Sequence, residues 1–271
     1  MRLWRAGHPT RALAALERAV ARYPYGAERA RAVRTLGDFH FELARYGEAE
    51  AVLRRALDEG STDALVPLAH SQRRQGRFDA AEATLQEAPR TGAVCNALGV
   101  VYKETGRFAE AAEQYAAALA ASSVDVELHA DICHNLAGLA YAQGRFAEAV
   151  APAREALALR ERVRPTEVAA DVAVLGAVLV GVDELDEAEA LLRRAYGMWT
   201  RRFGPDHYEA AVCLHNLGVL QYRRGDHAGA ADTLRQALRI KQAVLGPAHY
   251  EIAALLDNLA VVKRRRAAAC R

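Results

Sequence analysis

Gly106-Arg107-Phe108-Ala109-Glu110-Ala111 is the clearest copy of a phrase that recurs along this chain. Close copies begin at Gly76 and Gly144, and weaker ones occur at Tyr46-Gly47-Glu48-Ala49, Leu185-Asp186-Glu187-Ala188 and Gly225-Asp226-His227-Ala228-Gly229-Ala230. A small residue after leucine precedes every copy: Leu36-Gly37, Leu68-Ala69, Leu98-Gly99, Leu136-Ala137, Leu175-Gly176 and Leu217-Gly218, and Leu259-Ala260 follows without a phrase after it. The small residues are 32, 30, 38, 39, 42 and 42 positions apart.

A period of this length indicates a repeat architecture in which each unit is one pair of helices stacked on the next pair. Small residues are expected where the two helices of a unit cross, which predicts close packing at Gly99, Ala137, Gly176 and Gly218. Two prolines disturb the pattern. Pro67 should kink its helix or delay its start, because proline lacks the backbone N–H, and Pro152 also falls inside a predicted helix.

The units resemble the tetratricopeptide repeat, which implies an all-α, right-handed α-solenoid of about seven helix-turn-helix units. The connectors Phe203-Gly204-Pro205-Asp206-His207 and Leu245-Gly246-Pro247-Ala248-His249 are similar to those of kinesin-light-chain-type repeats. The prediction is one continuous solenoid, divided into a truncated first repeat (1–26), generic repeats 1–3 (27–123), kinesin-light-chain-type repeats 4–6 (124–248) and an unpaired terminal helix (249–271).

The two ends of the array are expected to lack a partner helix. The chain should open in the last turns of a first helix and stop after a helix without its partner. Leu255, Leu256, Leu259 and Val262 then lie on a face that the missing helix would share. Either this helix caps the array by itself, or the apolar face pairs two copies in a homodimer, or the chain is part of a longer protein.

Composition agrees with an all-helical protein and limits its partners. Alanine, the best helix former, contributes 60 of the 271 residues, and 36 basic against 34 acidic residues leave a net charge of +2. Such a balance provides no strong field for nucleic acid, so a nucleic-acid partner is not expected. Because no apolar segment is long enough for a membrane span and no signal peptide is recognisable, we expect a cytoplasmic protein. The excess of alanine and arginine is typical of a bacterial, GC-rich genome.

No motif for catalysis, cofactor or metal binding stands out. The four cysteines (Cys95, Cys133, Cys213 and Cys270) contain no closely spaced pair, and the first three are predicted to be reduced core residues. There is no His-x-x-x-His, no Gly-x-Ser-x-Gly and no glycine-rich phosphate loop. The sequence therefore predicts neither catalytic residues, metal nor cofactor, and His207 and His249 are assigned to packing of the connectors.

The resemblance implies that the first helices of successive units line a concave groove, where family members hold extended peptides. Asparagines at the positions of Asn135, Asn216 and Asn258 clamp the peptide backbone in such members, because an amide both donates and accepts. In the alternative reading, these amides bond neighbouring helix backbone. The candidate ligand-binding residues are Asn96, Lys103, His134, Asn135, Tyr141, His215, Asn216, Tyr222, Arg223, Asp257 and Asn258.

The sequence therefore favours a non-enzymatic scaffold that binds a peptide or protein segment in the groove. Two alternatives remain open at this point. The groove lined by histidine, tyrosine and asparagine could hold a small molecule in an enzyme or enzyme subunit, or the chain could be the regulatory part of a larger bacterial signalling protein.

Overall fold

The computed structural model describes residues 9–22, 26–122 and 125–269, and in these ranges the only regular elements are helices. They are α2 (Pro9–Arg22), α3 (Ala27–Glu42), α4 (Tyr46–Asp58), the short 3-10 helix η1 (Thr62–Ala64), α5 (Leu65–Arg74), α6 (Phe78–Gln86), α7 (Gly92–Glu104), α8 (Phe108–Ala121), α9 (Val126–Ala142), α10 (Phe146–Val163), α11 (Ala169–Gly181), α12 (Leu185–Phe203), α13 (Tyr208–Arg223), α14 (His227–Leu245) and α15 (Tyr250–Ala269). The predicted opening turns of a first helix fall in 1–8, outside the described residues.

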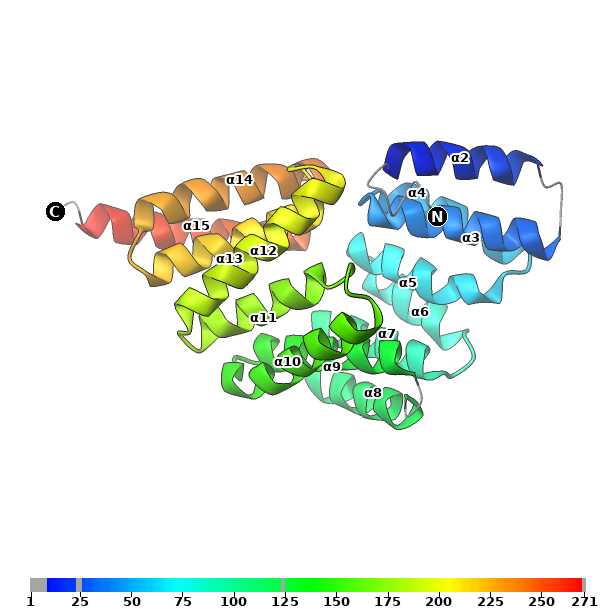
Figure 1. The fold of residues 1–271 in the computed structure, drawn as a ribbon, viewed down its shortest axis with the longest axis horizontal. Coiled ribbons are helices and arrows are strands. Elements are labelled where there is room, and N and C mark those ends of the chain that lie inside the picture. Colours follow the sequence, from blue (N-terminus) through cyan, green and yellow to red (C-terminus); the bar gives the residue numbers. More distant parts are fainter. Residues whose placement is uncertain (1–8, 23–25, 123–124, 270–271) are drawn as a thin grey trace.

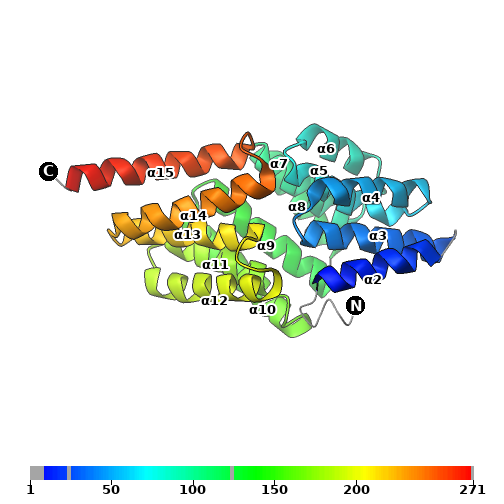
Figure 2. The ribbon, with the colours of Figure 1, turned by 90° about the horizontal axis from the view of Figure 1, so that it is seen from above.

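Successive helices pair and stack as the repeat predicts. The first helices of the units, α3, α5, α7, α9, α11, α13 and α15, contact one another in order, and each second helix packs against the first helices on either side of it. Figure 1 shows the stack bending into an arch, with α2 to α6 on one side, α12 to α15 on the other, and α7 to α11 joining them. In the view from above, α15 extends away from the first units, and only its start lies beside them (Figure 2). The all-α solenoid predicted from the repeat is confirmed.

The small residues lie at the helix crossings, as predicted. A Cβ on Gly99 of α7 would lie 2.4 Å from Cε1 of Tyr115 on α8, and a Cβ on Gly218 would lie 2.7 Å from a leucine of α14. Gly176 and Ala137, at the equivalent positions, are also buried. Helix axes approach this closely only where no side chain intervenes, so the sequence pattern fixes the geometry of each unit.

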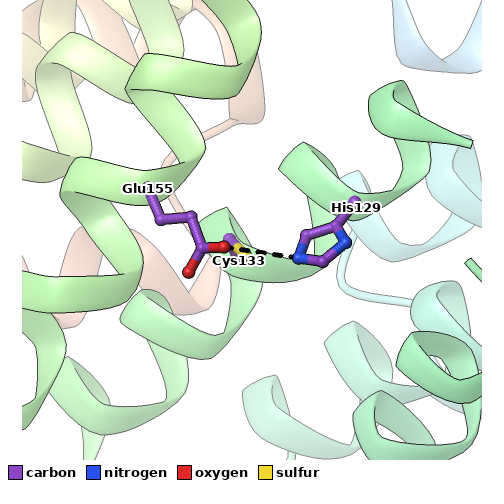
Figure 3. Close-up of side chains that lie close together, drawn as sticks. All are labelled: His129, Cys133 and Glu155. Atoms are coloured by element: carbon purple, nitrogen blue, oxygen red, sulfur yellow. Dashed lines mark ion pairs between the residues drawn. The ribbon is translucent and has the colours of Figure 1, made fainter. Parts of the chain in front are cut away.

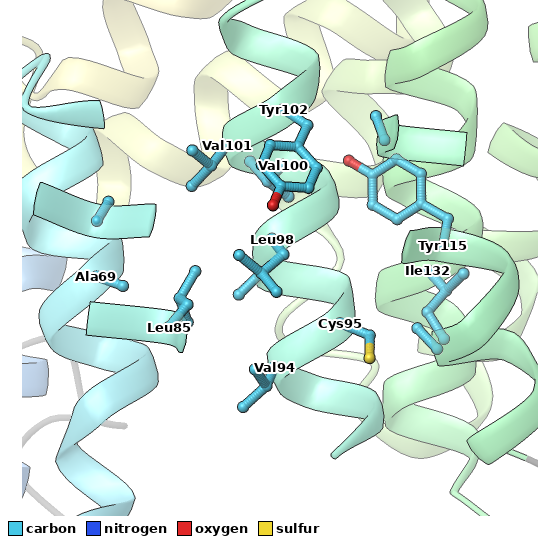
Figure 4. Close-up of a cluster of buried hydrophobic side chains, with 14 of the residues drawn as sticks. Ala69, Leu85, Val94, Cys95, Leu98, Val100, Val101, Tyr102, Tyr115 and Ile132 are labelled. Carbon is cyan, nitrogen blue, oxygen red and sulfur yellow. The ribbon is translucent and has the colours of Figure 1, made fainter. Parts of the chain in front are cut away.

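The core runs along the first helices from unit to unit. Figure 4 shows Val94, Leu98 and Cys95 of α7 between Leu85 of the preceding unit and Tyr115 on the other side. The cysteines Cys95, Cys133 and Cys213 are buried and free, which confirms their predicted core role, whereas Cys270 lies outside the described residues.

The turn between the two helices of a unit explains the glycine of the repeated phrase. Gly106 and Gly144 have φ angles of +77° and +70°, in the left-handed region that ends a helix. In two weaker copies of the phrase, Ala44 and Asp183 occupy this position, with φ of 56° and 70°. The turn geometry is therefore kept even where its preferred residue is missing.

Both prolines are accommodated within helices. The short η1 precedes α5, which begins at Leu65, so Pro67 lies in the first turn, where an unsatisfied N–H is normal. The expected delay in the start of this helix is confirmed. Pro152 lies inside α10.

The terminal helix differs from the expectation of an open apolar face. Leu255, Leu259 and Val262 are 0%, 4% and 3% exposed because they pack in one cluster with α14, and only Leu256, at 48%, is exposed. The expectation was wrong for three of the four residues, since the face of α15 that we assigned to a missing helix is the face that α14 covers.

Candidate functional site

Side chains of neighbouring first helices meet between α7 and α9. Asn135 Nδ2 of α9 donates a hydrogen bond of 3.0 Å to Asn96 Oδ1 of α7. In the part of the chain that the structure describes, neither Asn135 Oδ1 nor Asn96 Nδ2 has a hydrogen-bond partner. The pair therefore presents one free acceptor and one free donor, which is the complement of a peptide group.

A second pair lies between α13 and α15. Asn258 Nδ2 of α15 donates to His215 Nε2 of α13 over 2.8 Å. Burial, with the nearby charge of Lys241, lowers the pKa of His215 to about 4, so the imidazole is neutral at pH 7 and its Nε2 can accept. Both amides thus bond side chains of an adjacent unit, and not helix backbone. Asp257, beside Asn258, is exposed.

His134 belongs to a buried charge network. Its Nδ1 donates to Asp171 of α11 over 2.8 Å, and Arg160 Nε of α10 donates to the other oxygen of that carboxylate over 3.1 Å. Arg160 also pairs with Asp131 of α9. The Asp171 side chain is 2% exposed, so this network ties three helices of two units together and leaves His134 less free for a ligand than the sequence suggested.

Four other candidates, Tyr141, Tyr222, Arg223 and Asn216, take no part in these two pairs. Tyr141 packs edge-on against Phe146 of its own unit, with ring centroids 5.2 Å apart, and Tyr222 packs at a tilt against His227 of its own unit, with centroids 5.3 Å apart. Arg223 forms an ion pair of 3.1 Å with a carboxylate of the preceding unit, whereas Asn216 is half-buried and has no side-chain hydrogen bond among the described residues.

Lys103 projects from α7 toward α9. Its Nζ would lie 3.3 Å from a Cβ on Gly138, so the glycine leaves room for the ammonium group. Burial lowers the pKa of Lys103, and no ion pair to it occurs among the described residues. The adjacent Glu104 is instead bonded to Arg73 of α5 over 2.5 Å. Lys103 is therefore a cation that can pair with an incoming carboxylate.

Comparison with known proteins assigns the chain to a family. Four family models, each described as tetratricopeptide repeat, match residues 1–64, 45–98, 91–122 with 129–164, and 168–243. The chain belongs to the tetratricopeptide-repeat family. No curated protein sequence matches it.

Solved structures share the fold at low sequence identity. The crystal structure of the APC/C hetero-tetramer Cut9-Hcn1 aligns with 95% of this chain at a TM-score of 0.64 and 18% identity, and this chain spans 47% of that one, about half its length. A tetratricopeptide repeat protein from Parabacteroides merdae aligns at 0.56 and 14% identity, over 97% of this chain and 95% of that one. BtubC (BKLC) from P. vanneervenii aligns at 0.51 and 20%, over 84% of each chain. These likenesses describe the fold alone.

The tetratricopeptide units do not leave the groove open along its whole length, because a connector of the second half reaches the first half. His207 Nε2 bonds the backbone oxygen of Glu42 over 2.9 Å, and Arg74 of α5 pairs with Glu209 of α13 over 2.9 Å. The Arg74 guanidinium also lies 4.6 Å from the ring centroid of Tyr208, a cation–π contact. We call this set of contacts the seam.

The first residue of α15 extends the seam. Tyr250 packs against Phe78 of α6, with ring centroids 5.3 Å apart, and its hydroxyl lies 3.4 Å from Glu104 Oε2. A cavity of about 510 Å³ lies where the halves meet, lined by Ala44, Arg45, Tyr46, Gly47, Glu48, Arg74, Gln75, Ala243, Val244 and Leu245. The sequence contains no signal for the seam, because Arg74 and Glu209 are 135 residues apart.

Reversing one charge should open the seam. Arg74→Glu places a carboxylate against Glu209 and removes the cation over Tyr208, so we expect a larger radius of gyration by small-angle X-ray scattering. The double variant Arg74→Glu/Glu209→Arg should return toward the parent value. Arg145→Glu is the matched control, since Arg145 pairs only within its own turn. An unchanged scattering curve for Arg74→Glu would show that the ion pair does not hold the halves together.

In the described part of the chain, the structure has no helix that combines the length and the apolar character needed to cross a membrane.

Proposed function

We propose that this chain is a non-enzymatic binding module that holds an extended segment of a protein partner along the inner face of its first helices. Tetratricopeptide repeats generally mediate protein–protein interactions. The observation that supports this function most is the Asn96–Asn135 pair, whose free donor and acceptor can bond a main chain of any sequence. We also propose that the protein is bacterial, as its excess of alanine and arginine suggests, and that it is cytoplasmic.

The charge of the groove favours an acidic partner segment. Arg223 and Lys103 are both among the predicted ligand-binding residues, but Arg223 is paired with Asp183. Lys103 is the better candidate, because it has no ion pair among the described residues and a carboxylate would stabilise its buried charge. The segment would then run past Lys103, the Asn96–Asn135 pair and Asn216 toward Asn258.

The longer second helices support a kinesin-light-chain type for the units after residue 124. Helices α10, α12 and α14 have 18, 19 and 19 residues, against 13, 9 and 14 in α4, α6 and α8. A homodimer through the terminal helices stays a prediction, and only Leu256 of the four residues first assigned to it is exposed.

Removing two groove amides should weaken binding ten- to a hundredfold. Each asparagine hydrogen bond contributes about 0.5–1.5 kcal/mol net, and two together correspond to roughly that factor in Kd. A peptide selected from a random phage-displayed library on the parent protein provides the ligand, and fluorescence polarisation measures its affinity for Asn135→Ala/Asn216→Ala.

The control is Gln236→Ala, which removes an exposed amide from the second helix α14 and should leave the affinity unchanged. Circular dichroism and a urea melt verify that the double variant is folded. Equal affinity of the folded double variant and the parent would place the binding surface elsewhere.

A further inference from the structure

One cluster of potential metal ligands lies outside the groove, between the two helices of unit four. His129 and Cys133 are four residues apart on α9 and therefore share one face of that helix, and Glu155 faces them from α10 (Figure 3). Their ligand atoms all lie within 4.8 Å of one another, and His129 Nε2 lies 3.5 Å from Glu155 Oε1. Three different donor elements thus converge on one point.

The geometry is close to that of a tetrahedral site. Bonds of about 2.0–2.3 Å to zinc place neighbouring ligand atoms roughly 3.5 Å apart, which is the separation already present between His129 and Glu155. The His129 nitrogen and the Glu155 oxygen need to move only slightly closer to the Cys133 sulfur, because all three atoms already lie within 4.8 Å of one another. The Glu155 side chain is 56% exposed and can rotate to make this movement.

The repeat supplies an internal comparison. Cys95 occupies in unit three the position of Cys133 in unit four, and both are buried. The residues of unit three that correspond to His129 and Glu155 are Thr91 and Ala117, so the crossing packs without them. A buried cysteine at this position is ordinary core packing. The histidine and the carboxylate beside Cys133, in contrast, are absent from the equivalent crossing of unit three.

We propose that His129 Nε2, the Cys133 thiolate and one carboxylate oxygen of Glu155 bind a zinc ion. Nitrogen, sulfur and oxygen donors together suit this borderline-soft ion, and three protein ligands leave a fourth position for water. The thiol proton passes to solvent when the sulfur binds the metal. The ion joins α9 to α10 in the middle of the solenoid, so it stabilises unit four without occupying the groove.

Cobalt(II) titration of the whole chain tests this proposal, because a thiolate bound to cobalt gives a charge-transfer band in the near ultraviolet. We expect the band to saturate at one equivalent and to disappear when zinc displaces cobalt. Cys133→Ala should abolish the band, whereas the matched control Cys95→Ala should retain it. His129→Gln and Glu155→Gln, which change partly exposed side chains, should each lower cobalt affinity at least about tenfold.

A second measurement separates metal loss from misfolding. Zinc should raise the melting temperature of the parent and of Cys95→Ala but not of Cys133→Ala, and circular dichroism verifies the fold of each. Absence of the cobalt band in the parent overturns the proposal, as does a band that survives in Cys133→Ala, since another thiol then carries it. Equal zinc stabilisation of the parent and a folded Cys133→Ala also overturns it.

Discussion

Replacing Asp171 with alanine is expected to lower the free energy of unfolding by about 3–5 kcal/mol, the range for removing one partner of a buried ion pair. The Asp171 side chain is 2% exposed and holds both His134 and Arg160. Arg160 is itself only 13% exposed, so its charge would lose a buried partner. A urea melt at pH 7 measures the difference from the parent.

An exposed ion pair provides the control. Asp186 pairs with Arg224 but is fully exposed, so Asp186→Ala should change stability by about 0–1 kcal/mol. If Asp171→Ala and Asp186→Ala lowered the free energy of unfolding by similar amounts, the buried network would contribute no more to stability than a surface ion pair.

The Asp171 contribution should also depend on pH. Burial raises the pKa of this carboxyl. The hydrogen bonds and charges of His134 and Arg160 lower the pKa by more than burial raises it, so the result lies below the ordinary 3.8. A group whose pKa falls on folding stabilises the fold above its ordinary pKa and loses that effect as pH drops through the folded-state value. The difference between the parent and Asp171→Asn should therefore be largest above about pH 5 and shrink in acid.

Gly99→Leu is expected to cost about 3 kcal/mol, at the upper end of the range for overpacking. A Cβ alone would lie 2.4 Å from the Tyr115 ring, which is 0% exposed and has no room to move. The measurement is again a urea melt. The parent and the variant are compared with the same dependence of the free energy of unfolding on urea concentration.

Gly47→Ala is the matched control for this crossing. Gly47 lies in the first turn of α4, and a Cβ there would meet nothing within 4 Å. Alanine should leave stability unchanged or raise it by up to about 1 kcal/mol, because glycine is the poorer helix former. A stable Gly99→Leu variant would contradict the helix crossing assigned to unit three.

Much of the fold was predictable because its determinants are local. Each turn needs a residue in the left-handed region, which the glycine at 106 or 144 provides, and each crossing needs a small residue such as Gly99. Pro67 predicts the late start of α5, because a proline without a backbone N–H fits the first turn of a helix. Such signals lie within one unit, so a single sequence displays them.

The contacts between units were not predictable in this way. The repeat predicted which side chains of the first helices share a face, but the pairing of Asn135 with Asn96 depends on the rotation between α7 and α9. The seam depends on the rotation of each unit relative to the preceding one, added up over several units. No local sequence pattern determines this total rotation. Within unit four, the His129–Cys133–Glu155 cluster depends on which side of α10 faces α9, and the sequence pattern did not reveal Glu155 as a neighbour of His129 and Cys133.

The location of a bound peptide tests the central claim most directly. A peptide selected on the parent protein, carrying a benzophenone group, can be photo-crosslinked and its attachment sites mapped by mass spectrometry. The account predicts attachment on the inner face of α7, α9, α13 and α15, near Asn96, Asn135, Asn216 and Asn258. Attachment confined to the second helices α8, α10 and α14, with none on those first helices, would contradict it.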